Sequence, residues 1–565
     1  MKRQIFEIIP SAYRAKGLGV AVTIFIRALL NFAGLTALLP MLYIILNSEE
    51  MHSNSAMEWL YTSFGFASDA SFVAVVSAVL VGFIIVKNLI NLLLYRYERD
   101  YIYDLYRHLS RNLFIDYFAR GLQFIKSENS AVLSRNVNVV CYTFITGVLR
   151  PLATIASESA LLLMISVSIA IYSPVAAVLA VAVFIPTAWL YHSLMRLRLN
   201  RYGKEENESQ RKKYRNVIET YRGYADIEIN NAFGHQLDMF DDSVDTIVRV
   251  GRKNATISML PQNLTEIGLA VGLALLVSLS VSFGSDDMKL LFGVFAIAGL
   301  RILPSIRTIL GAWASLRYNC YTVDILCERP IGEKSEPATD SSRLNFEHAI
   351  ELQNVTFRFD NGDHDTISNL SLTIDKGEKV GINGESGTGK TTLINLLLGL
   401  YRPTAGKIMI DGVELDDTLL RKWQNSIGYV SQSVFLADDT LLSNIAIGCQ
   451  EGEVDMKRVE KAIEMASLSE FVTSLPNGIH TRIGECGALL SGGQRQRIGI
   501  ARALYRQADI LFFDEATSSL DSATEQSINR AIERLSTSNK ELTIVVVAHR
   551  ESSLAYCDRI VTIEK

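Results

Sequence analysis

The sequence lacks the residue patterns that mark metal centres and disulfide frameworks. Its 565 residues include only six cysteines, and none of them forms a C-x-x-C pair. Closely spaced cysteine pairs are the usual signature of a structural zinc site or a redox motif, so neither is expected here. We expect reduced, unpaired thiols in or near the cytoplasm, where disulfides are rare. They are Cys141, Cys320, Cys327, Cys449, Cys486 and Cys557.

A basic excess is also missing. Lys and Arg number 55 against 60 Asp and Glu, so the net charge is -5 and gives no sign of the basic face that binds nucleic acid. Charged residues make up only 20% while 49% are hydrophobic, which is too apolar for an ordinary soluble enzyme and too charged for a wholly intramembrane chain. The length also exceeds that of one ordinary domain. We expect an α-helical transmembrane domain at 1–330, a linker at 331–348 and an α/β domain at 349–565.

Long apolar runs are concentrated before residue 330. A helix needs about 20 mostly apolar residues to cross a bilayer, and six stretches meet this need, too many and too long for buried core helices of a soluble protein. The first run is also longer than the core of a secretory signal, so we expect it to be retained. The predicted spans are Gly17–Leu46, Phe72–Leu94, Thr143–Ile171, Pro174–Leu194, Leu260–Phe283 and Leu290–Ala314.

The distribution of Lys and Arg predicts the orientation of these spans. Both residues are absent from 47–71, between the first two spans, but frequent in 95–142 and 195–259. Because basic segments stay on the cytoplasmic side, we expect a multi-pass protein of the bacterial inner membrane with its N-terminus and C-terminal domain in the cytoplasm. The two basic segments have helical periodicity, so we expect each to extend its spans as helices. Short crossing helices are expected at their tips, near Phe124–Leu133 and Tyr224–Asn230.

The C-terminal part alternates short apolar strands with helical stretches, the pattern of an α/β domain. The strand Lys379–Asn383 runs into GESGTGKT and then into an apolar helical run, which is the strand–loop–helix setting of a phosphate-binding P-loop. Backbone N–H groups of such a loop cradle phosphates, the lysine reaches the β- and γ-phosphates, and the following hydroxyl binds Mg²⁺. The predicted ATP-binding residues are Gly384, Glu385, Ser386, Gly387, Thr388, Gly389, Lys390, Thr391 and Thr392.

A second motif, consisting of two acidic residues, follows the apolar strand ILFF. It places Asp514 to hold Mg²⁺, with Thr391, and Glu515 to act as general base on the attacking water.

A glycine-rich LSGGQ follows the P-loop by about 100 residues and precedes the helical run RQRIGIARAL. With this motif the chain resembles an ABC exporter half-transporter (type IV fold) over nearly its whole length. The resemblance implies ATP and Mg²⁺ as cofactors, a Q-loop Gln432 that also contacts Mg²⁺, a switch residue His549 beside the catalytic Glu515, and an adenine-stacking Phe359. It also identifies SSLD at Ser518–Asp521 as the D-loop, and Gly484–Gly487 as the loop before the signature, with Cys486 where a basic residue is usual.

The same resemblance implies that two copies share each ATP. The signature residues would close over the nucleotide held by the other subunit's P-loop, so the protein would work as a dimer. One chain carries all the ATPase motifs, which favours a homodimer and leaves a heterodimer open. The residues contributed in trans are Ser491, Gly492, Gly493 and Gln494.

Polar residues within the predicted spans are candidates for a substrate path, because such residues are costly in a membrane. Lys87, Arg301 and Arg307 could line a shared cavity around a kink expected at Pro304; alternatively they snorkel to the interface or pair with Glu266.

The membrane part also resembles flippases of polyprenyl-diphosphate-linked oligosaccharides, in LLPMLYIIL of span one, the lysine of span two, RILPSIR of span six and NCYTVDIL after it. This implies that the cations attract the pyrophosphate of the lipid. It also implies that Ala56–Phe66 is an external helix that contacts the lipid tail, although an ordinary interfacial anchor is equally consistent with it. Export of other lipids, including lipid A, of drugs or of peptides stays open. A soluble ABC ATPase is disfavoured by the spans, and a regulatory, non-transporting ABC protein by Glu515 and His549.

Overall fold

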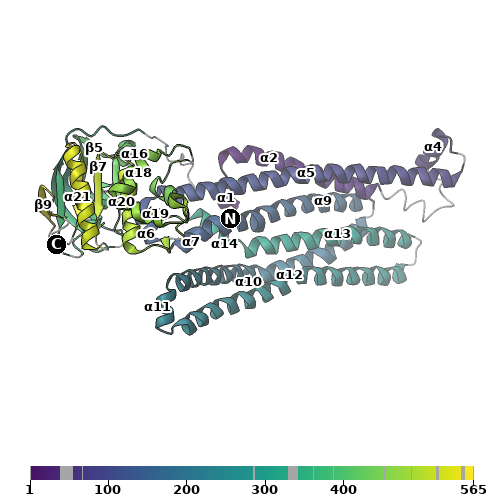
Figure 1. Ribbon diagram of the computed structural model, residues 1–565. Coiled ribbons are helices and arrows are strands. Elements are labelled where there is room, and N and C mark those ends of the chain that lie inside the picture. The colour runs from purple at the N-terminus through teal and green to yellow at the C-terminus, as the bar shows by residue number, and fades with distance from the viewer. Residues whose placement is uncertain are drawn as a thin grey trace. The chain divides into compact units, whose positions relative to one another are not determined.

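The computed structural model describes residues 2–37, 55–66, 68–172, 174–283, 287–328, 342–360, 362–385, 387–450, 452–484, 487–516, 521–548 and 554–563. The chain forms two compact units (Figure 1). Met1–Phe118 and Glu128–Lys334 make a helical unit, while Ala119–Ser127 and Ser335–Lys565 make a unit of mixed helices and strands. The predicted linker lies largely outside the described residues, so its limits at 331 and 348 stay a prediction.

The first unit consists of helices throughout its described part. Its elements are α1 (Lys2–Ile8), α2 (Ser11–Thr36), α4 (Ser55–Ser63), α5 (Asp69–Ala119), α7 (Ser130–Arg135), the π-helical η2 (Asn136–Val140), α8 (Cys141–Phe144), the π-helical η3 (Ile145–Leu149), α9 (Arg150–Tyr172), α10 (Pro174–Arg222), α11 (Tyr224–Ile229), α12 (Phe233–Phe283), α13 (Asp287–Tyr318) and α14 (Tyr321–Cys327).

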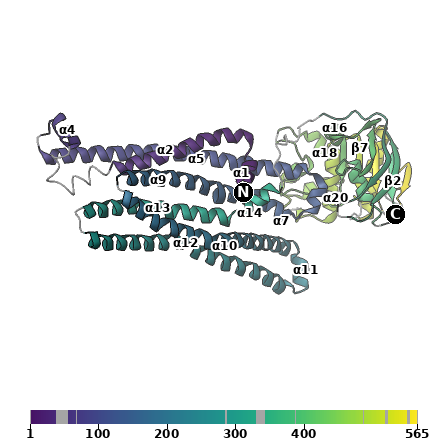
Figure 2. The ribbon, with the colours of Figure 1, turned by 180° about the vertical axis from the view of Figure 1, so that it is seen from behind.

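Several of these helices are much longer than a membrane is thick. Helices α5, α10 and α12 have 51, 49 and 51 residues, and at about 1.5 Å per residue each exceeds a hydrocarbon core of about 30 Å. Helices α10 and α12 run side by side, with α11 at their common tip (Figures 1 and 2). By length and composition, three helical stretches among the described residues can cross a membrane: Ser11–Thr36, Asp69–Ala119 and Ser130–Ile171.

Prolines do not interrupt these helices. Helix α13 continues through Pro304, where the sequence suggested a kink, and α10 and α12 continue through Pro186 and Pro261. Neighbouring helices and hydroxyl side chains compensate for the missing N–H group in such bundles. Pro261 leaves the carbonyl oxygen of Ile257 without its helical donor, and the hydroxyl of Tyr191 on α10 donates to that oxygen at 3.4 Å.

Residues 55–66, between the first two predicted spans, carry aromatic side chains on both a packed and an exposed side. Tyr61 and Phe66 pack edge-on against Phe72, which is 1% exposed at the start of α5. Trp59 and Phe64 on α4 and just after it point outward, 65% and 72% exposed. The aromatic residues therefore both fasten α4 to α5 and offer an apolar face.

The second unit contains two sheets and their covering helices. Its elements are α6 (Gly121–Ser127), β1 (Ala349–Phe357), β2 (Ile367–Asp375), β3 (Lys379–Asn383), α15 (Lys390–Leu397), β4 (Ala405–Ile410), β5 (Val413–Glu414), α16 (Asp417–Asn425), β6 (Ile427–Val430), α17 (Leu441–Ile445), α18 (Met456–Met465), α19 (Ser469–Ser474), η4 (Gly478–His480), α20 (Gly492–Tyr505), β7 (Ile510–Asp514), α21 (Ser522–Ser538), β8 (Thr543–Val547) and β9 (Arg559–Thr562).

One sheet is antiparallel in the order β2-β1-β4-β5, and the other is parallel in the order β6-β7-β8-β3-β9. Strands β7 and β8 are buried along their whole length, which explains their unbroken apolar sequences, since strands covered on both faces do not alternate. One core lies between the two sheets and α15, and a second joins α17, α18 and α20 to the parallel sheet.

Candidate functional site

The parallel sheet gathers the predicted ATP-handling residues at its carboxyl edge. Ile382 of β3 is in register with Val547 of β8, and Val547 is in register with Asp514 of β7. The P-loop and Glu515 therefore leave the sheet from one row, where ligands of open α/β sheets bind. His549 follows β8 by two positions but lies outside the described residues.

The P-loop needs glycine at positions where its backbone is left-handed. Gly389 has φ of 94°, and a Cβ there would lie 2.9 Å from the carbonyl oxygen of Thr366. The ammonium group of Lys390, 5% exposed, donates to the carbonyl oxygens of Gly384 and Glu385 at 2.9 and 2.7 Å. The lysine that the sequence assigns to phosphate thus points into the loop. Ser386 lies outside the described residues.

Asp514 is a buried carboxylate with spare binding capacity. It is 1% exposed, and its Oδ1 has no hydrogen-bond partner among the described residues. Burial, with the negative charge of Glu515, raises the pKa of Asp514 to about 6, while the charges of Lys126 and Lys390 act in the opposite direction. An orphaned carboxylate oxygen beside a phosphate-binding loop fits a Mg²⁺ ligand, because this cation prefers oxygen donors and substrate phosphates.

The next residue, Glu515, adopts a left-handed backbone with φ of 48°. Its N–H donates to the carbonyl oxygen of Val547 at 2.9 Å, and its Oε2 accepts a hydrogen bond from Nε2 of Gln432 at 2.7 Å. The structure therefore brings together two residues that the sequence assigns to one reaction although they are 83 positions apart.

The signature residues are organised as a helix cap. The hydroxyl of Ser491 accepts from the N–H of Gln494 at 3.2 Å, and the Gln494 side chain accepts from the N–H of Ser491 at 2.8 Å. This reciprocal capping box opens α20 at Gly492. Within the described part of the second unit, no hydrogen bond or ion pair joins Ser491–Gln494 to the P-loop.

The aromatic residue predicted to stack on adenine lies after β1. Phe359 is 36% exposed and sits edge-on to Phe357 and Tyr401, with centroids 4.9 and 5.7 Å away. Lys126 of α6 lies over the Tyr401 ring at 5.9 Å, and Leu122 packs against the core between the sheets. The segment near the first predicted crossing helix therefore belongs to this unit.

The structure describes the side chains of two of the three predicted substrate-path residues. Lys87 lies against α2, with its ammonium nitrogen 2.9 Å from where a Cβ of Gly34 would be. Arg307 is exposed on α13, and the side chain of Arg301 lies outside the described residues. Glu266 accepts a hydrogen bond from Gln262 of its own helix at 3.2 Å.

Other polar groups of these helices are paired across helices, and the sequence reasoning missed two of them, Glu158 and Glu98. Glu158 of α9 accepts a hydrogen bond from Ser305 of α13 at 2.7 Å, next to Pro304. Arg27 of α2 pairs with the buried Glu98 of α5. Glu158 is visible as an acid inside the third apolar run, and this signal could have found it.

Comparison with known families decides what the second unit is. A family model described as "ABC transporter" matches residues 367–518, which include the P-loop, Gln432, the signature and Asp514–Glu515. The chain contains an ABC transporter domain.

The similarity to known proteins is longer than the ABC transporter domain and therefore includes part of the helical unit. An "ATP-dependent lipid A-core flippase" of Cupriavidus pinatubonensis is 33% identical over 390 residues, which cover 68% of this chain and 65% of the relative. A protein of the same name from Burkholderia pseudomallei is 35% identical over 392 residues, covering 68% and 64%. The chain thus spans slightly less than two thirds of these relatives' length.

A solved structure shares the fold over nearly the whole chain. It is described as a bacterial Atm1-family ABC exporter with ATP bound, with a TM-score of 0.76 and 22% identity, and covers 98% of this chain and 94% of that chain. The predicted fold class, a helical domain followed by an ABC ATPase domain, is confirmed at this level.

Proposed function

We propose that this protein hydrolyses ATP and uses the energy to move a glycolipid across the bacterial inner membrane. The observation that carries the proposal is the Gln432–Glu515 hydrogen bond beside Asp514 and the P-loop, in a chain whose other unit has apolar helices of membrane length.

Each ATP-handling residue has a distinct role in the proposal. Lys390 leaves the loop carbonyls to bind the β- and γ-phosphates, and Phe359 stacks on the adenine. Mg²⁺, when bound, neutralises charge on the phosphates; Thr391, Gln432 and Asp514 are the residues that would hold it. Glu515 accepts the proton of the attacking water, oriented by Gln432, and His549 contacts the γ-phosphate.

The proposal includes six spans, with the N-terminus and the ABC transporter domain in the cytoplasm, as the Lys and Arg distribution predicts. It also includes a homodimer, in which Ser491, Gly492, Gly493 and Gln494 act on the ATP of the other subunit. The cap that Ser491 and Gln494 form leaves the positive end of α20 available to an anion.

For the cargo, we propose a polyprenyl-diphosphate-linked oligosaccharide whose pyrophosphate is attracted by Lys87, Arg301 and Arg307. Lipid A-core is the second candidate, because the relatives similar to this chain carry that name. Both are anionic glycolipids, and the exposed Arg307 and the span-two Lys87 suit either.

ATPase rate in liposomes tests this function. We expect undecaprenyl-pyrophosphate glycan to stimulate hydrolysis, and Lys87→Gln and Arg307→Gln to reduce the stimulation at least about fivefold, as loss of a charge-assisted contact predicts. Arg96→Gln, at an exposed position on the same helix as Lys87, is the control, and we expect the glycan to stimulate its ATP hydrolysis as it does in the native protein. Stimulation by lipid A-core alone would select the second cargo, and stimulation only by apolar drugs would overturn both.

A further inference from the structure

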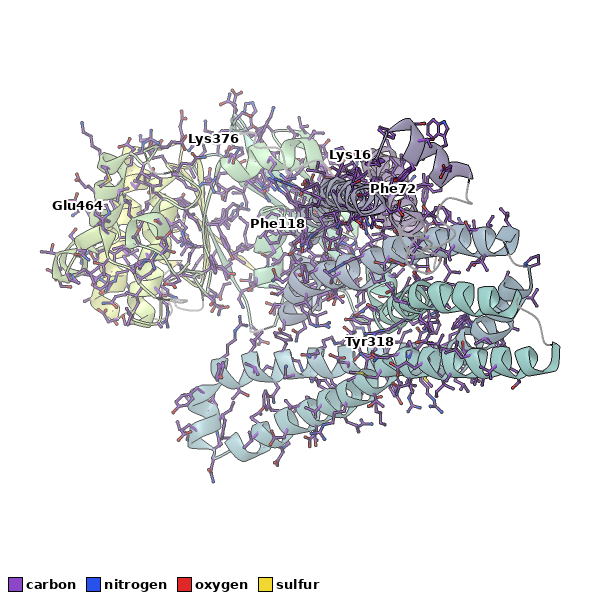
Figure 3. The ribbon with its side chains drawn as sticks, turned by 90° about the vertical axis from the view of Figure 1, so that its right-hand side faces the viewer. Lys16, Phe72, Phe118, Tyr318, Lys376 and Glu464 are labelled. Carbon is purple, nitrogen blue, oxygen red and sulfur yellow. The ribbon has the colours of Figure 1, made fainter. Side chains whose placement is uncertain are left out.

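A polar cavity lies in the helical unit, away from the ABC transporter domain. Its volume is about 250 Å³, and its walls come from α7, η2 and α8, from the C-terminal half of α10 and from the junction of α13 with α14. Most of its lining falls outside the predicted spans, since α10 contributes residues 203–214 and the junction contributes 318–321. Tyr318 marks the junction at the end of α13 (Figure 3).

One wall of the cavity carries a buried positive charge. Arg135 is 6% exposed, and one terminal nitrogen donates to Oδ1 of Asn207 at 2.5 Å. Its Nε is also buried and has no hydrogen-bond partner among the described residues. No described carboxylate lies within ion-pair distance of it. A buried guanidinium without a carboxylate in contact is costly, and an anion in the cavity would relieve that cost.

The acid in the cavity wall interacts with Arg135 only at a distance: burial raises the pKa of Glu206, and the charge of Arg135 acts in the opposite direction. Glu206 accepts a hydrogen bond from the hydroxyl of Tyr318, beyond ion-pair distance of Arg135. Its negative charge opposes highly charged anions such as polyphosphates, so the cavity suits one compact oxyanion. Two neutral side chains line the same space: the Tyr321 hydroxyl is hydrogen-bonded to Arg135, and the Gln210 amide is hydrogen-bonded to Glu206.

The packing around the cavity is rigid enough to hold a defined site. A Cβ at Gly203 would lie 1.7 Å from the carbonyl oxygen of Tyr318, so α10 and the end of α13 touch through their backbones. A Cβ at Gly147 would likewise lie 2.5 Å from the side chain of Asn319. Sites built on such fixed elements are already ordered before the ligand binds.

We propose that this cavity binds a single phosphate group through Arg135, and that the bound group ties η2, α10 and the α13–α14 junction together. The guanidinium presents N–H donors in the planar arrangement that phosphate oxygens match. The phosphate is either free inorganic phosphate or a monophosphate on a glycolipid headgroup. With inorganic phosphate the site is independent of the cargo proposed above, and with a glycolipid headgroup it rests on the second cargo candidate, lipid A-core.

Equilibrium binding of radiolabelled inorganic phosphate tests the site. The full-length protein in nanodiscs is first saturated with a non-hydrolysable ATP analogue and Mg²⁺, so that the P-loops are occupied. We expect saturable phosphate binding, weakened at least about tenfold in Arg135→Gln, which removes a charged hydrogen-bond donor. Arg198→Gln, an exposed position on α10, is the matched control and leaves the affinity unchanged.

A second variant keeps the positive charge of Arg135 and removes the cavity volume beside it. Gln210→Trp fills the cavity while Arg135 stays, so it abolishes binding even if Arg135→Gln fails to fold. Lipid A-core vesicles that displace the label would show a headgroup source, and vesicles that do not would show free phosphate. Absence of saturable binding in the native protein, or undiminished binding in Gln210→Trp, would overturn the proposal.

Discussion

Asp514 and Glu515 are two adjacent residues that folding alone would not favour. A buried acceptor without a partner costs on the order of 1–3 kcal/mol, and a left-handed backbone at a residue other than glycine costs about 1–2 kcal/mol. Both residues stand at the edge where the P-loop leaves the sheet. We infer that the site keeps these unfavourable features because ATP and metal binding require them.

Replacing Asp514 with asparagine should have opposite effects on the stability of the ABC transporter domain without metal and on its binding of Mg²⁺. Because the pKa of Asp514 is raised in the folded state, the folded protein holds its proton more tightly than the unfolded chain, and stability is lost as pH rises through about 6. Asp514→Asn removes this loss, so in EDTA it stabilises the domain above that pH by on the order of 2 kcal/mol. Thermal unfolding at acidic and neutral pH measures the difference, which should shrink in acid.

The same variant should lose the response to Mg²⁺. With ATP present, Mg²⁺ raises the unfolding temperature of the native protein and leaves that of Asp514→Asn nearly unchanged. Asp363→Asn, at an exposed position, should behave as the native protein does in both experiments. A variant that is less stable than native at neutral pH in EDTA would show that the carboxylate is not strained.

The residues of the ATP site could be read from the sequence because each motif is local. The P-loop, Asp514–Glu515 and the signature are short runs whose chemistry depends on their neighbours in the chain. The Gln432–Glu515 hydrogen bond and the orphaned oxygen of Asp514 depend on sheet order and burial, which no local pattern encodes. Arg135 lies in the basic segment 95–142, where the sequence does not distinguish it from the other basic residues, because its burial follows from packing between distant helices.

At the scale of elements, long helices were predictable and their interruptions were not. The apolar and helical periodicity predicted continuous helices through the basic segments, and short helices occur near both expected tips, α6 with α7 and then α11. The side chain of Asn129 caps α7 and separates it from α6, so the first tip holds two helices instead of one. The π-helical turns η2 and η3 leave no period in the sequence that would reveal them.

The crossing of α10 and α13 makes a prediction about one glycine. Gly203→Ala places a methyl group against the carbonyl oxygen of Tyr318, and backbone cannot move aside as a flexible side chain can. Overpacking of this kind costs about 1–3 kcal/mol or more. We expect a lower unfolding temperature in detergent. Gly251→Ala on α12, where nothing lies within 4 Å of the new methyl group, should be neutral or slightly stabilising. Equal behaviour of the two variants would mean that the helices do not touch through their backbones.

At the scale of the whole molecule, one copy of the chain does not complete the proposed site. Ser491 and Gln494 satisfy each other in a cap, and no described hydrogen bond or ion pair links them to Lys390. A second copy would supply the signature residues to each P-loop, and a symmetric pair would hold two equivalent sites. This arrangement is what the resemblance to ABC exporters implies, and it belongs to the proposed function.

Mixing two inactive variants tests the shared site. Lys390→Ala removes the P-loop lysine and Ser491→Arg obstructs the signature, so each homodimer has two defective sites and little ATPase activity. In an equal mixture half of the dimers are mixed, and each of these has one intact site, so we expect up to about a quarter of the native rate, less if the sites depend on each other. Lys390→Ala mixed with Glu515→Gln is the control: both changes lie on the P-loop side of the site, so every dimer stays defective. Recovery in the first mixture and none in the second requires that two chains build each site, whereas equal rates in both mixtures would contradict two shared sites that work independently.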